Sequence, residues 1–259
     1  MSNQTLENGH IAVELQNKVA HISFYHPLSN SFPTALLQKL TKEIQEISQN
    51  ESINLVVLKS EGNGAFCAGA SFDELLKVDS LETGQKFFSG FANVINAMRK
   101  CPKMIVGRVH GKTVGGGVGL IAACDYVFAH QSSAVKLSEL AIGIGPFVIE
   151  PVVSKKIGKT NMSALTLSPW TWKDAKWAFE KGLYQELFES DEAMDEAIRV
   201  YISNISSYNP EALFEMKKIL WEQTEHWDVL LAERAAISGK LVLSDFTKKA
   251  LEAFKNKGK

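Results

Sequence analysis

The sequence predicts a mixed α/β core followed by an all-helical C-terminal region. Two stretches, residues 55–71 and 104–125, run in the order β-branched strand, turn of small residues, helix. From residue 191 onward the apolar residues recur with helical spacing only. Strands that alternate with helices along a chain are typical of a layered α/β core, so we expect that core in residues 1–190 and helices in residues 191–259.

Residues 11–15 and 19–24 alternate apolar and polar positions on either side of a short polar turn, which predicts an antiparallel hairpin. His21 is then a strand residue and not a catalyst. After the loop at residues 26–31, Pro33 predicts the start of an amphipathic helix. The apolar face of this helix consists of Leu36, Leu37, Leu40, Ile44 and Ile47.

The same patterns predict the later elements. A long helix is expected at residues 81–99. Short apolar runs predict three further strands, at residues 103–109, 125–129 and 134–137. The C-terminal helices are expected at residues 192–203, 211–224, 227–239 and 244–255. Trp221 and Trp227 in this region are expected in the core or at a subunit interface, and not as ligand platforms.

The composition is that of one globular domain, or one domain with an appendage, with 259 residues, 45% hydrophobic and 22% charged. A net charge of −1 gives no electrostatic reason to expect a nucleic-acid partner. The three cysteines, Cys67, Cys101 and Cys124, have no spacing typical of a metal site, and their odd number indicates reduced thiols. Each is expected to fill the core as a small apolar residue.

The first nine residues are polar, without the basic start and apolar core of a signal peptide. No apolar run reaches the roughly 18 residues that a membrane-spanning helix needs. We therefore expect a cytoplasmic protein that has no membrane partner.

Three consecutive glycines, Gly115 to Gly117, lie between a strand and an apolar helix. Glycines at a helix start let backbone N–H groups approach a ligand, and the unpaired donors of the first turn favour negative charge. This run indicates a site for a phosphate or a developing oxyanion. Gly117, Gly119 and Ala122 also fit a dinucleotide-binding fingerprint, but the run lies in mid-chain and Glu139, about 20 residues on, does not end a strand. A glycine turn that only packs a helix close to a sheet is a third interpretation.

A second strand and small-residue turn lie upstream, at residues 55–70. The run Ala65-Phe-Cys-Ala-Gly-Ala70 in this turn, and the run from Gly115-Gly-Gly117 to Cys124-Asp125, resemble the crotonase superfamily, also called the enoyl-CoA hydratase/isomerase family. The resemblance extends through residues 174–183 and covers most of the chain. It implies a ClpP/crotonase-like α/β fold, a superhelix of repeated ββα turns. It also implies that the C-terminal helices cover the active site and join subunits into a homotrimer, or into a homohexamer formed as a dimer of trimers.

The resemblance implies an acyl-CoA thioester as the substrate, with no metal and no cofactor besides the coenzyme A of the substrate itself. Proton removal next to the thioester carbonyl moves negative charge onto its oxygen, and fixed N–H donors stabilise that charge. By resemblance, these donors are the backbone N–H groups of Ala70 and Gly116. The residues expected to bind the substrate around them are Ala68, Gly69, Ser71, Gly115, Gly117 and Phe147.

Family members with full hydratase activity are similar in carrying two glutamates, and this sequence departs from that pattern. The first position is Gly119 and the second, 20 residues on, is Glu139. Two carboxylates hold a water between them, whereas a single carboxylate takes a proton from C-2 and returns it at C-4. Residues 144–148 also resemble the isomerase branch of the family. The resemblance thus favours an isomerase of fatty acid metabolism that converts 3-enoyl-CoA into 2-enoyl-CoA with Glu139 as its base.

Other interpretations stay open at this point. A hydratase, which is a lyase of fatty-acid or branched-chain amino-acid degradation, recruits its second acid or water elsewhere; Ser138, Asp73 and Glu150 are conceivable second groups. A family member without catalysis acts as a CoA-thioester binding protein. Glu139 is in that case only a helix-start or salt-bridging carboxylate.

Overall fold

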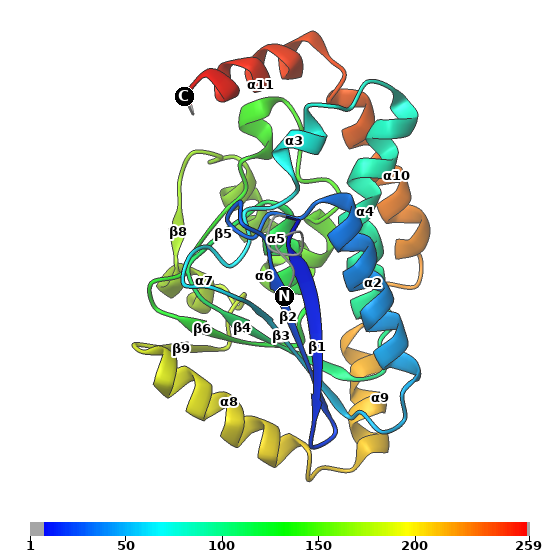
Figure 1. Cartoon of the computed structure of the whole chain (residues 1–259), viewed down its shortest axis with the longest axis vertical. Coiled ribbons are helices and arrows are strands. Elements are labelled where there is room, and N and C mark those ends of the chain that lie inside the picture. The colour runs from blue at the N-terminus through cyan, green and yellow to red at the C-terminus, as the bar shows by residue number, and fades with distance from the viewer. Residues whose placement is uncertain (1–7, 258–259) are drawn as a thin grey trace.

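A six-stranded sheet runs through the middle of the molecule (Figure 1). The computed structural model describes residues 8–257. The strand order is β1-β2-β3-β4-β6-β9, in which β1 and β2 are antiparallel and all other neighbours are parallel. The strands are β1 (His10–Gln16), β2 (Val19–Tyr25), β3 (Leu55–Ser60), β4 (Met104–Val109), β6 (Tyr126–His130) and β9 (Glu186–Phe188).

A second, three-stranded sheet lies beside the first and leads directly into the candidate site. Its order is β5-β7-β8, with strands β5 (Lys112–Val114), β7 (Ala134–Lys136) and β8 (Lys173–Asp174). β5 and β7 are parallel, and Val114 lies opposite Lys136. Because β5 leads into helix α5 (Gly116–Ala123) and β7 leads into the 3-10 helix η1 (Glu139–Ile142), this pairing brings the starts of both helices together.

Helices surround the two sheets. In Figure 1, α2, α4 and α10 lie side by side at one side of the sheet, α8 runs along its lower edge, and α11 lies at the top near α3. The remaining bounds are α2 (Thr34–Gln49), α3 (Phe72–Leu75), α4 (Leu81–Lys100), α6 (Glu150–Thr166), α7 (Ala175–Glu180), α8 (Asp191–Ile205), α9 (Pro210–Leu220), α10 (Trp227–Leu241) and α11 (Asp245–Lys257).

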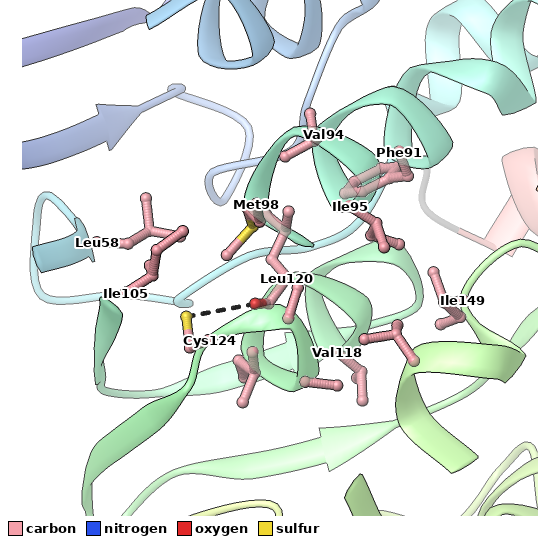
Figure 2. Close-up of a cluster of buried hydrophobic side chains, with 14 of the residues drawn as sticks. Leu58, Phe91, Val94, Ile95, Met98, Ile105, Val118, Leu120, Cys124 and Ile149 are labelled. Carbon is pink, nitrogen blue, oxygen red and sulfur yellow. Dashed lines mark hydrogen bonds between the residues drawn. The ribbon is translucent and has the colours of Figure 1, made fainter. Parts of the chain in front are cut away.

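The main sheet separates two apolar clusters. On β3, Val56 and Leu58 belong to the larger cluster, while Leu55 and Val57 belong to the smaller one beneath α8, as the alternation of a strand requires. Figure 2 shows the part of the larger cluster in which side chains of α4 and α5 meet those of β3 and β4. The three cysteines are buried and unpaired, so their expected role as core residues is confirmed.

Most expected elements are confirmed. The hairpin forms as β1 and β2, with His21 opposite Glu14. All five apolar residues expected on the face of α2 are buried. The four C-terminal helices are present, and Trp221 and Trp227 lie in the core, where their rings meet edge to face at 6.0 Å. The expected α/β core followed by C-terminal helices is therefore confirmed.

The sequence patterns did not reveal β5, β8, β9 and α6. The three strands are only two or three residues long, too short to show an alternation. Helix α6 carries Pro151 in its first turn and is interrupted at Gly158, whose φ of 74° is not helical. Its buried residues therefore lack a continuous period of 3.6.

Residues 1–7, and with them most of the polar start, lie outside the described residues. Across residues 8–257, no helix is both long enough and apolar enough to cross a membrane.

Asp125, directly before β6, ties the C-terminal region to the core. Its carboxylate accepts the Ile105 N–H (2.7 Å), the Lys217 ammonium (2.5 Å) and the Trp221 indole N–H (2.8 Å). The side chains of Asp125 and Lys217 are 6% and 3% exposed. The pair is thus buried, and the Asp125 carboxylate attaches α9 to the start of β4.

This network predicts a large loss of stability for Asp125→Ala. Removal of one member leaves the Lys217 charge buried and unpaired, which costs about 3–5 kcal/mol of the free energy of unfolding. Urea unfolding followed by tryptophan fluorescence measures this loss. Glu46→Ala removes a carboxylate from the exposed Lys42–Glu46 pair and should cost about 0.5 kcal/mol or less. Equal losses in the two variants would contradict the anchoring role of Asp125.

Candidate active site

Backbone hydrogen bonds hold the turn that follows β3. The Cys67 N–H donates to the Lys112 carbonyl (3.4 Å), and the Val114 N–H donates to the Cys67 carbonyl (2.9 Å). The next residue, Ala68, donates its N–H to the Ser29 carbonyl (3.1 Å). The turn is thereby joined to β5 on one side and to the loop after β2 on the other.

Ala70 lies at the end of this turn, in a bridge to Phe32. The bridge consists of the Phe32 N–H bonded to the Gly69 carbonyl (2.8 Å) and the Ser71 N–H bonded to the Phe32 carbonyl (2.9 Å). Neither bond uses the Ala70 N–H. The Ser71 hydroxyl caps α3 by accepting the Glu74 N–H (3.3 Å). Ala70 therefore offers a backbone donor that the bridge leaves available.

The second turn places Gly116 beside the first. Gly115 has φ 56° and ψ −124°, and its N–H donates to the Lys136 carbonyl (3.0 Å). Gly116 is the first residue of α5, where backbone N–H groups have no acceptor within the helix. A Cβ added at Gly69 would lie 3.8 Å from the Gly116 nitrogen, so the two turns are in contact.

The Glu139 carboxyl lies against the glycine turn. A Cβ added at Gly115 would lie 3.0 Å from Oε1 of Glu139. Oε2 is buried and has no hydrogen-bond partner among the described residues. Burial raises the pKa of this carboxyl to about 7, although the backbone N–H groups of Ser138 and Glu139 lower it. Near neutral pH the group can accept and return a proton.

These groups share one cavity of about 410 Å³. The predicted residues that line it are Ala68, Gly69, Ala70, Gly115, Gly116, Glu139 and Phe147. Its wall is mostly apolar, and its aromatic members include Phe87, Phe88, Phe91 and Phe254. Two predicted substrate-binding residues lie outside the lining: Ser71 caps α3, and Gly117 packs against Cys67, 2.7 Å from an added Cβ.

Gly119 lies in α5, where the expected first glutamate of a hydratase is missing. A Cβ there would lie 2.5 Å from Cγ2 of Ile149 and 3.5 Å from Cδ1 of Ile95. The branched side chain of Ile149 thus fills the space next to Gly119, and Ile149 itself lines the cavity. Among the residues that line this cavity, Glu139 is the single carboxylic acid.

The three conceivable second groups have different positions. Ser138 lines the cavity beside Glu139. Asp73 lies on α3 and is not part of the lining. Glu150 is also outside it and accepts a hydrogen bond from the Ser154 hydroxyl (2.6 Å). Ser138 is therefore the one member of this set that can touch a ligand in the cavity.

A larger cavity, of about 710 Å³, lies between the main sheet and α8. Arg108 in this cavity pairs with Asp191 (3.0 Å) and with Asp195. His110, beside this pair, is buried, and burial lowers its pKa. This cavity contains neither glycine turn, so the smaller one is the candidate active site.

Sequence reasoning missed Lys136, Ile149 and Trp170, which line the cavity with the predicted residues. Lys136 is three positions before Glu139, on the strand that leads to it, and that spacing was a readable signal. No pattern in the sequence indicates that Ile149 contacts Gly119 or that the loop containing Trp170 returns to the site.

The cavity thus brings together a carboxyl whose pKa is near neutral, two backbone donors and an apolar wall, an arrangement that can stabilise a developing negative charge with amides. The sequence profile of the family described as Enoyl-CoA hydratase/isomerase matches residues 14–259. The chain therefore belongs to the enoyl-CoA hydratase/isomerase family, which is also called the crotonase superfamily. It is a family of acyl-CoA enzymes.

Relatives in this family catalyse different reactions. The bacillaene synthase dehydratase PksH of Bacillus subtilis is 26% identical over 81% of this chain and 80% of that protein. The mitochondrial Delta(3,5)-Delta(2,4)-dienoyl-CoA isomerase of Mus musculus is 26% identical over 82% of this chain and 68% of that protein. The crystal structure of an enoyl-CoA hydratase from Bacillus halodurans superposes with a TM-score of 0.88 at 22% identity, covering 94% of this chain and 99% of that chain.

The raised pKa of Glu139 predicts a pH-dependent effect on stability. A carboxyl whose pKa rises from 4.5 to about 7 on folding stabilises the folded state below pH 4.5 and loses that contribution as the pH rises through 7. Glu139→Gln stays neutral, so its stability relative to the parent protein should increase between pH 4 and pH 8, by on the order of 3 kcal/mol. Urea unfolding at both pH values measures this change, with Glu46→Gln as the surface control. The same relative stability at both pH values would contradict a pKa that burial raises.

Proposed function

We propose that this protein is an isomerase that converts a 3-enoyl-CoA into the 2-enoyl isomer, with Glu139 as its single base. One observation carries the proposal: the cavity that contains the Ala70 and Gly116 amides is lined by one carboxylic acid, Glu139. Water addition to an enoyl thioester uses two acids in the family pattern. The place of the first is filled by Ile149 packed on Gly119.

The reaction follows from the placement of these groups. The Glu139 carboxylate takes a proton from C-2, and the electron pair of that C–H bond moves toward the thioester carbonyl. The Ala70 and Gly116 N–H groups donate to the resulting oxyanion. In enzymes that stabilise an oxyanion with such donors, loss of one donor raises the activation free energy by about 2.7–4 kcal/mol. The Glu139 carboxyl then returns the proton to C-4 as the double bond moves into conjugation.

The pKa of Glu139 suits both halves of this cycle. A group whose pKa is near the working pH is an effective base when ionised and an effective acid when protonated. At about 7, the Glu139 carboxyl spends comparable fractions of time in each form near neutral pH. The proposal thus needs no second titrating group in the cavity.

The direct test is incubation of the purified protein with 3-hexenoyl-CoA. We expect the absorbance of the conjugated thioester to rise without a change of mass. kcat/KM should increase as the pH rises through about 7, because the free enzyme acts through the ionised Glu139. Glu139→Gln should lower kcat by at least about 100-fold, since general-base catalysis contributes roughly 10²–10⁴.

The matched control is Glu150→Gln, a neighbouring carboxyl that lies outside the cavity lining. It should keep the activity of the parent protein. If 2-hexenoyl-CoA instead gains the mass of one water at a higher rate than 3-hexenoyl-CoA isomerises, the protein is a hydratase. If Glu139→Gln binds hexanoyl-CoA normally and neither enoyl-CoA reacts with the parent protein, the chain is a CoA-thioester binding protein.

The contact between Gly119 and Ile149 makes a second prediction. Gly119→Glu alone should be destabilising, by about 1–3 kcal/mol or more, because even its Cβ would lie 2.5 Å from Ile149. The pair Gly119→Glu with Ile149→Ala provides both a second carboxylate and room for it. We expect this double variant to add water to 2-hexenoyl-CoA, detected as a mass gain, while Ile149→Ala alone does not. Equal hydration by both variants would show that Gly119 does not decide the reaction.

A further inference from the structure

Lys136 is a basic residue in the lining of the cavity, which it shares with Glu139 and Gly116. Its carbonyl accepts the Gly115 N–H (3.0 Å), so its backbone is bonded to the glycine turn itself. In the described part of the chain, neither Lys136 nor Lys112 forms an ion pair within 4.0 Å.

The two lysines lie over one aromatic ring. The Nζ atoms of Lys136 and Lys112 are 4.5 Å and 5.1 Å from the centre of the Trp172 ring. Burial, and then the charge of Lys112, lower the pKa of Lys136. The acid nearest by strand register, Asp174 of β8, caps α7 by accepting the Trp177 N–H (2.8 Å). Lys136, which lines the cavity, and Lys112, which does not, thus place two positive charges over Trp172, and neither is paired with a carboxylate of the described residues.

We propose that Lys136, assisted by the charge of Lys112, binds an anionic group of the thioester substrate. The inference rests on the proposed function, because it takes the ligand to be an acyl-CoA. Such a ligand has two sources of anion, namely a carboxylate at the far end of the acyl chain and the phosphates of coenzyme A. A negatively charged partner at a half-buried lysine forms a charge-assisted hydrogen bond and removes the repulsion between the two lysines.

The position of Lys136 favours the acyl carboxylate. Its strand is bonded to Gly115, next to the Gly116 amide that receives the thioester oxygen in the proposed reaction. The phosphates of coenzyme A are separated from the sulfur by the whole pantetheine arm, whereas the end of a short acyl chain stays within this cavity of about 410 Å³. The substrate class is then an enoyl-CoA whose acyl chain ends in a free carboxylate.

The test is calorimetric binding of two saturated thioesters, hexanoyl-CoA and adipoyl-CoA. They have the same chain length and differ in the terminal carboxylate, and neither has a double bond that the enzyme can move. We expect adipoyl-CoA to bind at least about tenfold more tightly, as a hydrogen bond to a charged group implies. Lys136→Met keeps the length of the side chain and should abolish this preference while hexanoyl-CoA binds as before. Lys136→Arg should keep part of it.

Lys173→Met is the matched control. Lys173 belongs to the same small sheet, but its Nζ lies over Trp177 (5.8 Å from the ring centre) and it does not line the cavity. This variant should keep the full preference for adipoyl-CoA. A decrease as large as that of Lys136→Met would overturn the assignment to Lys136, because it would reflect general surface charge.

Hexanoyl-pantetheine, which lacks the phosphates, distinguishes the two anion sources. If Lys136→Met weakens both CoA thioesters equally and leaves hexanoyl-pantetheine unchanged, the anion is a phosphate and Lys136 still binds it. If Lys136→Met changes the affinity of neither CoA thioester, the proposal is wrong. These binding measurements involve no turnover, so they test the role of Lys136 separately from catalysis. If the protein prefers adipoyl-CoA but isomerises no enoyl-CoA, the proposed function is wrong and the role of Lys136 stands.

Discussion

The contact between the Glu139 carboxyl and Gly115 is the constraint on which the rest of the site depends. Gly115 has a φ of 56°, which residues other than glycine rarely adopt. A Cβ at this position would lie 3.0 Å from Oε1 of Glu139. The pairing of β5 with β7 sets this contact, because the Gly115 N–H is bonded to the Lys136 carbonyl. Since β5 leads to the amide of Gly116 and β7 leads to Glu139, one small sheet fixes the distance between the Gly116 N–H and the Glu139 carboxyl.

The packing around this contact determines the chemistry of the carboxyl. Burial raises its pKa, and the two local backbone N–H groups that oppose this effect are outweighed. Ile149 contributes to the same apolar wall and also occupies the space beside Gly119. A second carboxylate at position 119 would overlap the Ile149 side chain, and its negative charge would repel that of ionised Glu139. The same packing thus raises the pKa of Glu139 and excludes a second carboxylate beside Gly119.

How much of this site the sequence predicts depends on the range of the interactions involved. The glycine turn and Glu139 were predicted, because local conformation and a family spacing mark both. The contact of Ile149 with Gly119 was not, since it joins residues distant in sequence through shape alone. Helix α6 was missed because Pro151 and the non-helical Gly158 interrupt its period. Gly117 was expected to bind substrate from the motif, but its environment is the Cys67 side chain, which only the packed structure supplies.

The C-terminal region completes the environment of Glu139. Gly143 ends η1 with a φ of 82°, and a Cβ there would lie 2.5 Å from Cδ1 of Phe246 at the start of α11. Further along α11, Phe254 lines the cavity and its ring lies 5.4 Å from that of Phe72. Because the pKa of Glu139 depends on burial, docking of α11 onto η1 and the raised pKa of this carboxyl are coupled. Helix α11 is thus part of the environment that sets the protonation of Glu139, although it contributes no titrating group to the cavity lining.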